Sequence, residues 1–546
     1  MADNNSRMNL AEMGTFTSNE LSQKFHLNTK HGWSNDLQTM VWNEAGQYYD
    51  VYFLHSVEGP ERPFGEQGQD WFHATTKDFL HFSEQNIAIP AFGPKGEGSW
   101  RSAWTGTVIR NKNNQIKGVP DGALVAYFSG LMQGDPKLNQ HIWAAWSDDN
   151  GQTFANLLND GQPVLSCDWD YTAADDMSER DPGVMYWNDR LIMYTSEDKE
   201  IAVFQSEDGI EWRGMNENPR LSKIAPAVFF AGHKWTANAQ IECPVLRPMV
   251  TPDGQEKVVL FFAAKEEPIE TTGSYYAVGT LNKHGMFQLD EAPRRLDAGS
   301  DFYGVNYTGS DDLSKPDKDI VVLGWTGNWN YAAAGIHLDQ GGQSKFVKHW
   351  GPYSTPRRLT LNNDLTISSE IMLNLVYEEE REISAAPAES NSTDIPDLMH
   401  KRYEIKQDLN HSIYNLKIQA AAGKKVEGTV SIRFEQGKDF AQLDFDPKSG
   451  TYHVMRMNWE FENDNQANHA FDYYSRSYTV QSDAKELQSL NFEVITDQAS
   501  IEFILPDGSF YTLSRFCVSD KQDLSVSLAD DSLESTLTAK VVKPFN

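Results

Sequence analysis

Ser147-Asp148-Asp149-Asn150-Gly151-Gln152-Thr153-Phe154 is a complete turn motif, and looser copies of it recur along the chain. In such a turn the aspartate caps the backbone, the glycine takes a positive φ, and the final aromatic residue packs between sheets. Related stretches cover residues 76–82, 206–212 and 282–287. The recurrence indicates a β unit that is repeated along the first part of the chain.

The spacing of these copies predicts the architecture. They begin at residues 76, 147, 206 and 282, which lie 71, 59 and 76 residues apart, and this is the length of a four-stranded blade with generous loops. Short aromatic or β-branched runs such as 48–53, 123–128 and 257–262 lie between them, and helical periodicity is scarce. The pattern fades after Asn363. We therefore predict a five-bladed β-propeller; the alternative is a turn-rich β protein in which such turns arise by chance.

The rest of the chain predicts further β structure, so the fold class is all-β. Residues 1–20 are expected to be an N-terminal tail and residues 21–377 the propeller. The stretch 378–398 is acidic and rich in Ser, Ala and Pro, which is typical of a connector. Residues 399–546 alternate apolar and polar positions, with turn signals at the spacing of a β-sandwich.

Composition limits the possible partners. A chain of 546 residues suits two domains, and its net charge of −31 opposes binding to nucleic acid or to anionic membranes. The 3 cysteines have no CxxC spacing, so neither a disulfide framework nor a zinc site is predicted. No metal or cofactor is implied. Nothing in the sequence indicates the oligomeric state.

The N-terminal residues MADNNSRMNLAEMG contain neither a basic region nor an apolar region, and no apolar run of ~18 residues could cross a bilayer. We expect an extracellular protein whose signal peptide is absent from this sequence. If Met1 is native, we expect a cytoplasmic one.

Three carboxylate segments in the first half of the chain are the strongest indication of chemistry. They are residues 33–36, 179–182 and 241–244, which carry Asp36, Asp181 and Glu242. Each lies at a turn-like break, where a carboxylate can be held at a strand end that faces a shared cavity. Carboxylates so placed can act as acid, base or nucleophile. Taken singly, each could also be a turn cap or a surface acid.

In combination these segments resemble the motifs of glycoside hydrolase family 32, the invertase, levanase and inulinase group. The resemblance covers nearly the whole chain and implies a five-bladed propeller followed by a β-sandwich. The matching segments are Trp33-Ser34-Asn35-Asp36, Trp71-Phe72-His73-Ala74, Trp104-Thr105-Gly106-Thr107, Arg180-Asp181-Pro182, Glu242-Cys243-Pro244, Asp301-Phe302-Tyr303-Gly304, residues 324–332 and, in the sandwich, Ser500-Ile501-Glu502-Phe503-Ile504.

The resemblance implies that Asp36 is the nucleophile, Glu242 the general acid/base and Asp181 a stabiliser of the transition state. A retaining fructosidase needs this division of roles, because one carboxylate attacks the anomeric carbon while another protonates the leaving oxygen. We expect Glu242 to be protonated and Asp36 ionised near neutral pH. The remaining residues of the implied fructosyl-binding subsite are Asn35, Gln38, Trp71, Trp104, Thr105, Arg180, Asp301 and Trp325; Trp71 and Trp325 could equally be core residues.

Departures from the invertase pattern bear on the substrate, which the resemblance implies to be a fructan or fructo-oligosaccharide. Leu37-Gln38 follows the first aspartate, and Leu54 stands where many invertases have glutamine. Both features resemble endo-levanases and levan fructotransferases, so we favour levan, the β-2,6-linked fructan. A sucrose or inulin β-fructosidase, a fructosyltransferase and a non-catalytic fructan-binding homologue are the alternatives. A sialidase, which needs an arginine triad and a nucleophilic tyrosine, does not fit these motifs.

Overall fold

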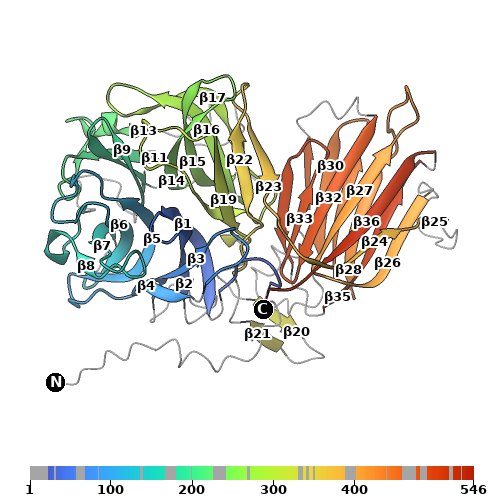
Figure 1. Ribbon diagram of the computed structural model, residues 1–546, viewed down its shortest axis with the longest axis horizontal. Helices are drawn as coiled ribbons and strands as arrows, with labels where there is room; N and C mark the ends of the chain where they lie inside the picture. Colours follow the sequence, from blue (N-terminus) through green and yellow to red (C-terminus); the bar gives the residue numbers. More distant parts are fainter. Residues whose placement is uncertain are drawn as a thin grey trace.

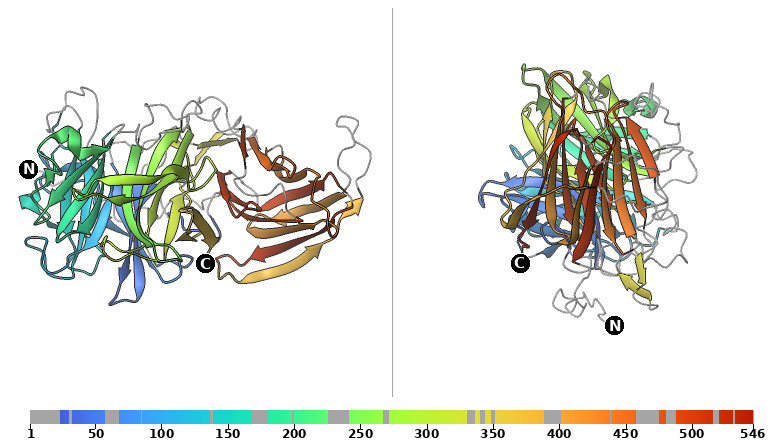
Figure 2. Two further views of the ribbon diagram at one scale, coloured as in Figure 1. Left: turned by 90° about the horizontal axis from the view of Figure 1, so that it is seen from above. Right: turned by 90° about the vertical axis from the view of Figure 1, so that its right-hand side faces the viewer.

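In the computed structural model of this chain the regular secondary structure is almost entirely β-strand, and the strands form two lobes that lie side by side (Figures 1 and 2). The residues that it describes are 23–29, 32–56, 68–83, 85–135, 139–166, 180–197, 200–224, 241–266, 271–329, 336–339, 344–347, 351–387, 401–437, 439–457, 475–479, 488–515, 520–530 and 532–545. The predicted tail, residues 1–20, lies outside them.

The first lobe is built from five antiparallel sheets, which confirms the predicted five-bladed propeller. The first strand of each sheet belongs to a ring around the propeller axis: β1 contacts both β5 and β18, and β9 contacts both β5 and β14. The blades are β1 (Trp33–Asn43), β2 (Tyr48–Ser56), β3 (Asp70–Thr76) and β4 (Asn86–Ile89); β5 (Trp100–Arg110), β6 (Leu124–Met132), β7 (Gln140–Trp146) and β8 (Asn156–Leu157); β9 (Arg180–Trp187), β10 (Arg190–Glu197), β11 (Glu200–Ser206), β12 (Arg213–Gly214) and β13 (Lys223–Ile224); β14 (Ile241–Val250), β15 (Glu256–Glu266), β16 (Thr271–Leu281) and β17 (Phe287–Arg295); and β18 (Tyr303–Tyr307), β19 (Asp319–Trp325), β22 (Arg357–Leu361) and β23 (Ile367–Ile371).

Among the described residues, three short features lie between these strands. Two are 3-10 helices, η1 (Asn159–Gly161) and η2 (Pro219–Ser222), and the third is a two-stranded sheet formed by β20 (Ile336–Asp339) and β21 (Ser344–Val347).

The recurrent turn motif joins the third and fourth strands of the first four blades. In the complete copy, Asp149 Oδ1 accepts hydrogen bonds from Ser147 Oγ at 2.7 Å and Thr153 N at 2.9 Å. Gly151 has a φ of 93°, and Phe154 is buried between blades. In the first copy Phe79 occupies the glycine position and adopts a φ of 60°. The motif therefore has the geometry that the sequence predicts.

The fifth blade has the same kind of turn, which the sequence pattern does not reveal. It joins β22 to β23, and Asp364 Oδ1 accepts a hydrogen bond from Thr366 N at 3.1 Å. Here Leu365, rather than glycine, has the positive φ of 63°. Without a glycine or an aromatic residue, this copy gives no recognisable sequence signal.

Tyrosines tie neighbouring blades together. The second strand of each of the first three blades carries a buried tyrosine whose hydroxyl donates to the carbonyl of the turn glycine in the next blade. These hydrogen bonds run from Tyr52 to Gly151 at 2.8 Å, from Tyr127 to Gly209 at 2.9 Å and from Tyr194 to Gly285 at 2.6 Å. The turn motif thus also forms the joint between blades.

The second lobe is a β-sandwich of two antiparallel sheets around an apolar core, as predicted. Apolar and polar positions alternate along its strands; in β29, for example, every second side chain is buried. One sheet has the order β24 (Tyr377–Ile383), β36 (Glu534–Val542), β27 (Ser412–Gln419), β32 (Ser489–Asp497), β33 (Ser500–Ile504) and β34 (Phe510–Ser514). The other has the order β25 (Ala386–Pro387), β26 (Lys401–Leu409), β35 (Lys521–Leu528), β28 (Val430–Gln436), β29 (Asp439–Asp446), β30 (Thr451–Met457) and β31 (Ser475–Thr479).

The acidic stretch 378–398 differs in part from the predicted connector. Its first residues belong to β24, an edge strand that pairs with β36 of the sandwich. An edge strand can carry many charged side chains because much of its surface faces water, and Arg381 forms an ion pair with the buried Asp408. Residues 388–400 lie outside the described part of the chain.

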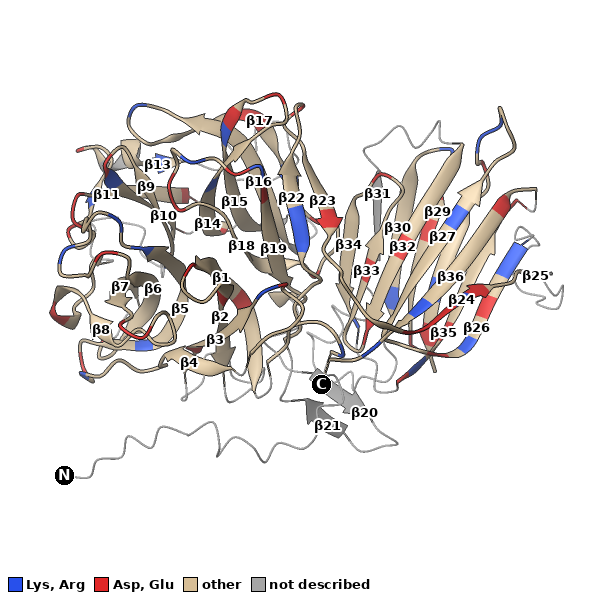
Figure 3. Cartoon of the chain, viewed as in Figure 1, with Lys and Arg blue, Asp and Glu red and all other residues tan. Residues whose placement is uncertain are grey.

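Acidic residues are distributed over both lobes, as Figure 3 shows, rather than collected on one face. Within the described ranges, no helix has the length and apolar character needed to span a membrane.

A buried charged network joins the two lobes. Arg357 of β22, which is 1% exposed, pairs with Asp297 Oδ2 at 2.7 Å and with Glu502 Oε2 of the sandwich at 2.6 Å. His26 contacts Glu502 Oε1 at 3.3 Å and Asp497 Oδ2 at 2.8 Å. Burial disfavours the imidazolium, but these two carboxylates outweigh it and raise the pKa of His26 to about 9. The family-like strand that contains Glu502 therefore serves the interface between the lobes.

This pKa predicts that stability depends on pH. The folded pKa of His26 lies above its ordinary value of 6.5, so its stabilising contribution is complete below pH 6.5 and disappears as the pH rises through about 9. The loss is on the order of 3 kcal/mol. We expect H26Q to abolish this slope in urea or thermal unfolding between pH 6 and 9.5, whereas H284Q, which alters an exposed histidine, keeps it. An H26Q protein with the wild-type slope would contradict the assignment.

Candidate active site

All five inner strands have a β-bulge near their first residues. In each strand the pairing register shifts across a three-residue step, and such bulges re-aim side chains at the rims of β structures. The steps are Ser34 to Leu37 in β1, Ala103 to Gly106 in β5, Arg180 to Gly183 in β9, Glu242 to Val245 in β14 and Tyr303 to Asn306 in β18. The three carboxylates of the sequence motifs therefore lie on bulges at the same end of the propeller.

Two residues at these bulges have unusual backbone geometry. Asp181 has a φ of 59° and Cys243 a φ of 52°, in the left-handed region that side chains with a Cβ rarely adopt. Strain of this kind persists where the surrounding structure enforces it, and it is concentrated at functional sites.

Asp36 lies deep in the site and is 7% exposed. Asn35 Nδ2 donates to Asp36 Oδ1 at 3.2 Å, and Gln69 Nε2 donates to Asn35 Oδ1 at 2.5 Å. On the other side, Cys243 Sγ lies 3.9 Å from Asp36 Oδ2. The carboxylate is therefore oriented by a chain of polar contacts that begins on the β3 side of the first blade.

Asp181 is held by main-chain contacts. Its Oδ2 accepts a hydrogen bond from Cys243 N at 3.0 Å and lies 3.7 Å from Cys243 Sγ, while its own N–H donates to Ser129 Oγ at 2.9 Å. Asp36 and Asp181 thus lie on either side of one buried thiol. Burial raises the pKa of Cys243 far above its ordinary value, and the nearby carboxylates add to this, so it is a packed neutral side chain.

Glu242 is the most accessible of the three carboxylates. Its side chain is 24% exposed, against 7% for Asp181. Arg180 Nη2 donates to Glu242 Oε1 at 3.2 Å, and the Tyr303 hydroxyl donates to Oε2. Tyr303 belongs to a family-like segment, but its contact with Glu242 is not evident from the sequence. An acid at the rim, positioned by a tyrosine and an arginine, can exchange protons with a bound molecule and with water.

The protonation of the cluster differs from the expected one. Burial, together with the charges of Glu242 and Asp181, raises the pKa of Asp36 to about 8. Burial also raises the pKa of Asp181, to about 6, although Arg180 opposes the shift. Near pH 7 the protonated form of Asp36 is therefore favoured. Three carboxylates share a single guanidinium here, so Asp36 does not remain fully ionised as expected.

The tryptophans of the expected subsite, and Thr105 beside one of them, differ in how deeply they are buried. Trp104 and Thr105 on β5 are 9% and 6% exposed, whereas Trp71 and Trp325 are 0% exposed. Trp71 donates its indole N–H to Trp104 O at 2.9 Å, and Trp325 packs edge-on against Trp33. Trp71 and Trp325 therefore support the site from the core rather than presenting a face to a ligand.

Gln38 and Asp301 also differ from the expected binding role. The buried Gln38 accepts a hydrogen bond from Gly106 N at 2.7 Å and donates to Asp36 O at 3.2 Å, so its amide ties β1 to β5. Asp301 is 0% exposed, pairs with Arg456 of the sandwich and accepts from Ser514 N at 2.8 Å. Tertiary contacts that a linear motif does not encode occupy both side chains.

Gly304 is a second site residue whose role is not evident from the sequence. It has a φ of 50°, and a Cβ at this position would overlap Asp36 Oδ1 and lie 2.8 Å from Asp36 Cα. The absence of a side chain therefore lets β18 pack directly against the Asp36 carboxylate.

We expect G304A to lower kcat by on the order of 10²-fold, because a displacement of about 1 Å at a reacting group has that effect. KM should change much less. G285A is the matched control: its φ is 70° and a Cβ would meet Met215 Cε at 2.6 Å, away from the carboxylates. It should lower the melting temperature and leave kcat intact. Equal losses of kcat in both variants would show that strain, rather than the position of Asp36, is responsible.

Within the described residues, no group of three or more His, Cys, Asp and Glu side chains has an arrangement that could hold a metal ion. Cys243 is a free thiol, and Cys167 and Cys517 lie outside the described part of the chain.

The propeller and its cluster of three carboxylates define the chain as a glycoside hydrolase. The family model "Glycosyl hydrolases family 32 N-terminal domain" matches residues 26–369, and the chain therefore belongs to glycoside hydrolase family 32. The match covers the propeller blades and all three carboxylates.

Individual relatives agree with this assignment. The chain is 27% identical over 314 residues to a levanbiose-producing levanase of Bacillus subtilis (strain 168), which covers 56% of this chain and 53% of that protein. It is 28% identical over 290 residues to a levanbiose-producing levanase of Geobacillus stearothermophilus; this alignment covers 52% of this chain and 64% of that protein. The matched region thus spans about half to two thirds of the length of these relatives.

Solved structures share the complete two-lobed fold. A fructofuranosidase from Schwanniomyces occidentalis complexed with fructose superposes with a TM-score of 0.72 at 19% identity, covering 97% of this chain and 100% of that one. An exo-inulinase from Aspergillus awamori gives a TM-score of 0.71 at 18% identity, covering 97% and 99%. At such identities the likeness establishes the fold alone.

Proposed function

We propose that this protein hydrolyses β-fructosidic bonds of a fructan, with levan as the preferred polymer, through a covalent fructosyl–Asp36 intermediate. The observation that carries the proposal is the unequal placement of the two reacting carboxylates. Asp36 is buried and held against Asn35, whereas Glu242 is at the rim, between Arg180 and Tyr303. A nucleophile and an acid/base so arranged are what retaining cleavage requires.

The reactive form has Asp36 ionised and Glu242 protonated. An Asp36 oxygen attacks C2 of the fructosyl unit while Glu242 gives its proton to the glycosidic oxygen, so the C2–O bond breaks and an ester forms. Glu242 then removes a proton from water, which attacks C2 and releases fructosyl product and Asp36. Asp181 binds fructosyl hydroxyls. Between the two steps Glu242 is ionised, and Arg180 stabilises its carboxylate.

The preference for levan is supported by the interior of the first blade and by the relatives. Leu54 is 0% exposed within an apolar cluster that includes Trp71, so the chain places no polar contact where many invertases have one. Leu37 is likewise buried. Two of the similar proteins are levanbiose-producing levanases, although invertases are also among the relatives. We infer that β-2,6-linked chains are the substrate class.

Products from three substrates test the proposal. We would incubate the purified protein separately with levan, inulin and sucrose, resolve the products by chromatography over time, and run D36A in parallel to exclude a contaminating hydrolase. Short fructo-oligosaccharides from levan, absent with D36A, are the expected result. If the protein releases fructose from sucrose at least as efficiently as it cleaves levan, it would instead be an enzyme of the invertase type.

Other products would identify the remaining alternatives. Cyclic or lengthened fructosides would show that a sugar hydroxyl replaces water in the second step, which is fructosyl transfer. If no substrate yields product, binding of levan by the intact protein would identify a non-catalytic homologue, and the proposed activity would be wrong.

A further inference from the structure

The segment that leads into β18 is held by the sandwich lobe. Ala298 N donates to Phe510 O at 2.9 Å, and three residues later Asp301 N donates to Thr512 O at 3.4 Å. Both acceptors belong to β34, the edge strand of its sheet. The segment passes so close to this strand that a Cβ on Gly299 would overlap Thr512 O. Contacts with the sandwich therefore determine where the chain enters β18.

A buried ion pair fixes the end of this segment. Arg456 of β30, which is 4% exposed, pairs with Asp301, which is 0% exposed. The same guanidinium nitrogen, Nη1, donates to Ser514 O at 2.8 Å, and Ser514 N donates to Asp301 Oδ2 at 2.8 Å. The arginine, the carboxylate and strand β34 thus form a closed set of contacts. Because hydrogen bonds to a planar guanidinium are directional, this arrangement fixes the orientation of Asp301 as well as its distance from the sandwich.

Arg456 occupies a position at which the pattern of β30 calls for an apolar side chain. Every second side chain along this strand is buried, and the first two of these, Tyr452 and Val454, pack in the core of the sandwich. The third is Arg456. A buried ion pair stabilises a fold little in comparison with apolar residues of the same volume, because the cost of desolvation offsets the attraction. Stability alone is therefore a poor reason for an arginine here.

Asp301 is separated by one residue from a side chain that contacts the proposed acid/base. Tyr303 begins β18, is 1% exposed, and donates its hydroxyl to Glu242 Oε2. Phe302 between them is buried, and its carbonyl accepts from Ser274 Oγ at 2.9 Å. Two residues of chain span at most about 7 Å. A displacement of Asp301 is therefore transmitted to Tyr303 and to its contact with Glu242.

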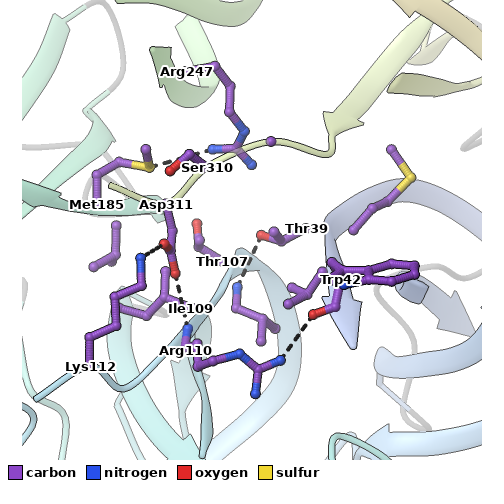
Figure 4. Close-up of a pocket in the computed structure, with 15 residues that line it drawn as sticks. Thr39, Trp42, Thr107, Ile109, Arg110, Lys112, Met185, Arg247, Ser310 and Asp311 are labelled. Carbon is purple, nitrogen blue, oxygen red and sulfur yellow. Dashed lines mark hydrogen bonds and ion pairs between the residues drawn. The ribbon is translucent and has the colours of Figure 1, made fainter. Parts of the chain in front are cut away.

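The other end of β18 is anchored within the propeller. Asp311, which follows β18, pairs with Lys112 and accepts a hydrogen bond from Arg110 N at 3.2 Å, beside the cavity shown in Figure 4. Arg110 Nη2 also donates to Trp42 O at 3.0 Å, which connects the first two blades. Strand β18 thus has an anchor at each end, and the one beside the carboxylates comes from the sandwich.

We propose that Arg456 is a positioning residue of the active site, which acts through Asp301 and Tyr303 on Glu242. The sandwich then takes part in the reaction without touching the substrate, because its arginine sets the position of the tyrosine that orients the acid/base. This inference rests on the proposed function, which makes Glu242 the acid/base.

The kinetics of R456Q test the proposal. We expect kcat on levan to fall about 10- to 100-fold while KM changes much less, because small displacements at a reacting group have effects of this size. R515Q is the matched control. Arg515 is also buried in the sandwich, at 6% exposed, but its side chain donates to Asn410 O, Asp497 O and Gln522 Oε1 of the same lobe. R515Q should lower the melting temperature and keep kcat. Equal losses of kcat in the two variants would overturn the proposal.

Combination with Y303F identifies the route from Arg456 to the acid/base. If Arg456 acts through Tyr303, adding R456Q to Y303F should lower kcat by no more than about twofold, since residues that act as a unit are not additive. Losses that multiply in the double variant would contradict this route. If R456Q does not fold, D301N/R456M takes its place, because it leaves no unpaired charge buried. It should show the same loss of kcat, and wild-type kcat in this variant would overturn the proposal.

Crystal structures of the variants test the positioning without reference to activity. In R456Q, or in D301N/R456M, the Tyr303 hydroxyl should lie beyond hydrogen-bond distance of Glu242 Oε2, whereas R515Q should keep the contact. An unchanged contact would overturn the inference even if the protein cleaves levan. If the contact is lost in R456Q but the wild type cleaves no fructan, the proposed function alone would be wrong.

Discussion

Replacing Asp36 by alanine is expected to lower kcat on levan by at least on the order of 10⁴-fold, with a preserved fold. The proposed nucleophile has no substitute nearby, because Asp181 is held by Cys243 N and by the left-handed backbone at its own position. D36N, which keeps the shape of the side chain, should lose as much activity. Initial rates with levan, together with far-UV circular dichroism, measure both quantities.

The control for Asp36 is D148N, which makes the same chemical change at an exposed turn position and should keep wild-type kcat. Removal of a buried carboxylate should also affect stability. The folded pKa of Asp36 is raised to about 8, so its contribution to stability is complete below about pH 4 and is lost as the pH rises toward 8. D36N should therefore melt at a higher temperature than the wild type at pH 7. A D36A protein that retains near-normal turnover would show that another residue is the nucleophile.

The second large effect is expected for E242Q, and it should depend on the leaving group. With levan, loss of the proton donor should lower kcat by roughly 10³- to 10⁴-fold. With 4-nitrophenyl β-fructofuranoside, whose leaving group needs no protonation, the first step should remain fast. Fructosyl-enzyme should then accumulate, and it would be detected by mass spectrometry as one added fructosyl unit on the peptide that contains Asp36. Added azide should release it as fructosyl azide.

E242Q also tests the electrostatic coupling in the site. Glu242 is one of the two charges that raise the pKa of Asp36, so its removal should move the acidic limb of kcat/KM for the aryl fructoside to lower pH. E382Q, an exposed substitution in the sandwich, should change neither kcat on levan nor the pH of the acidic limb of kcat/KM. Equal losses of activity on levan and on the aryl substrate would contradict an acid/base role.

Local sequence predicts the blades well because the third and fourth strands of each blade are joined by a turn with strict backbone requirements. The Asp149 cap and the positive φ of Gly151 require particular residue types, and those residues are visible in a linear pattern. The fifth turn uses Leu365 for its positive φ, a choice that the surrounding blade stabilises and that no local rule predicts. The tyrosines that join the blades carry a repeat signal that the turn pattern alone did not reveal.

The carboxylates of the site could likewise be found from sequence, whereas the supporting residues could not. Asp36, Asp181 and Glu242 lie in short motifs with unusual neighbours, but the contacts of Gln38 and Asp301 are made with distant segments, Gly106 and Arg456. The role of Gly304 is to leave space, which a motif does not express. Protonation of the cluster depends on how three acids share Arg180, and that too is a property of the assembled site.

The contacts of residues 23–29 with the sandwich have a consequence for how the chain folds during synthesis. Lys24 N and Phe25 N donate to Asp497, Gln23 donates to Ser500, and Phe25 packs with Val542 of the last strand. Residues 23–29 therefore cannot form these contacts until partners more than four hundred residues further along the chain have been synthesised. Contacts so remote in sequence make folding slow and favour its completion after translation. A ribosome-bound chain that lacks β32 to β36 should leave residues 23–29 open to protease, and release of the full chain should protect them.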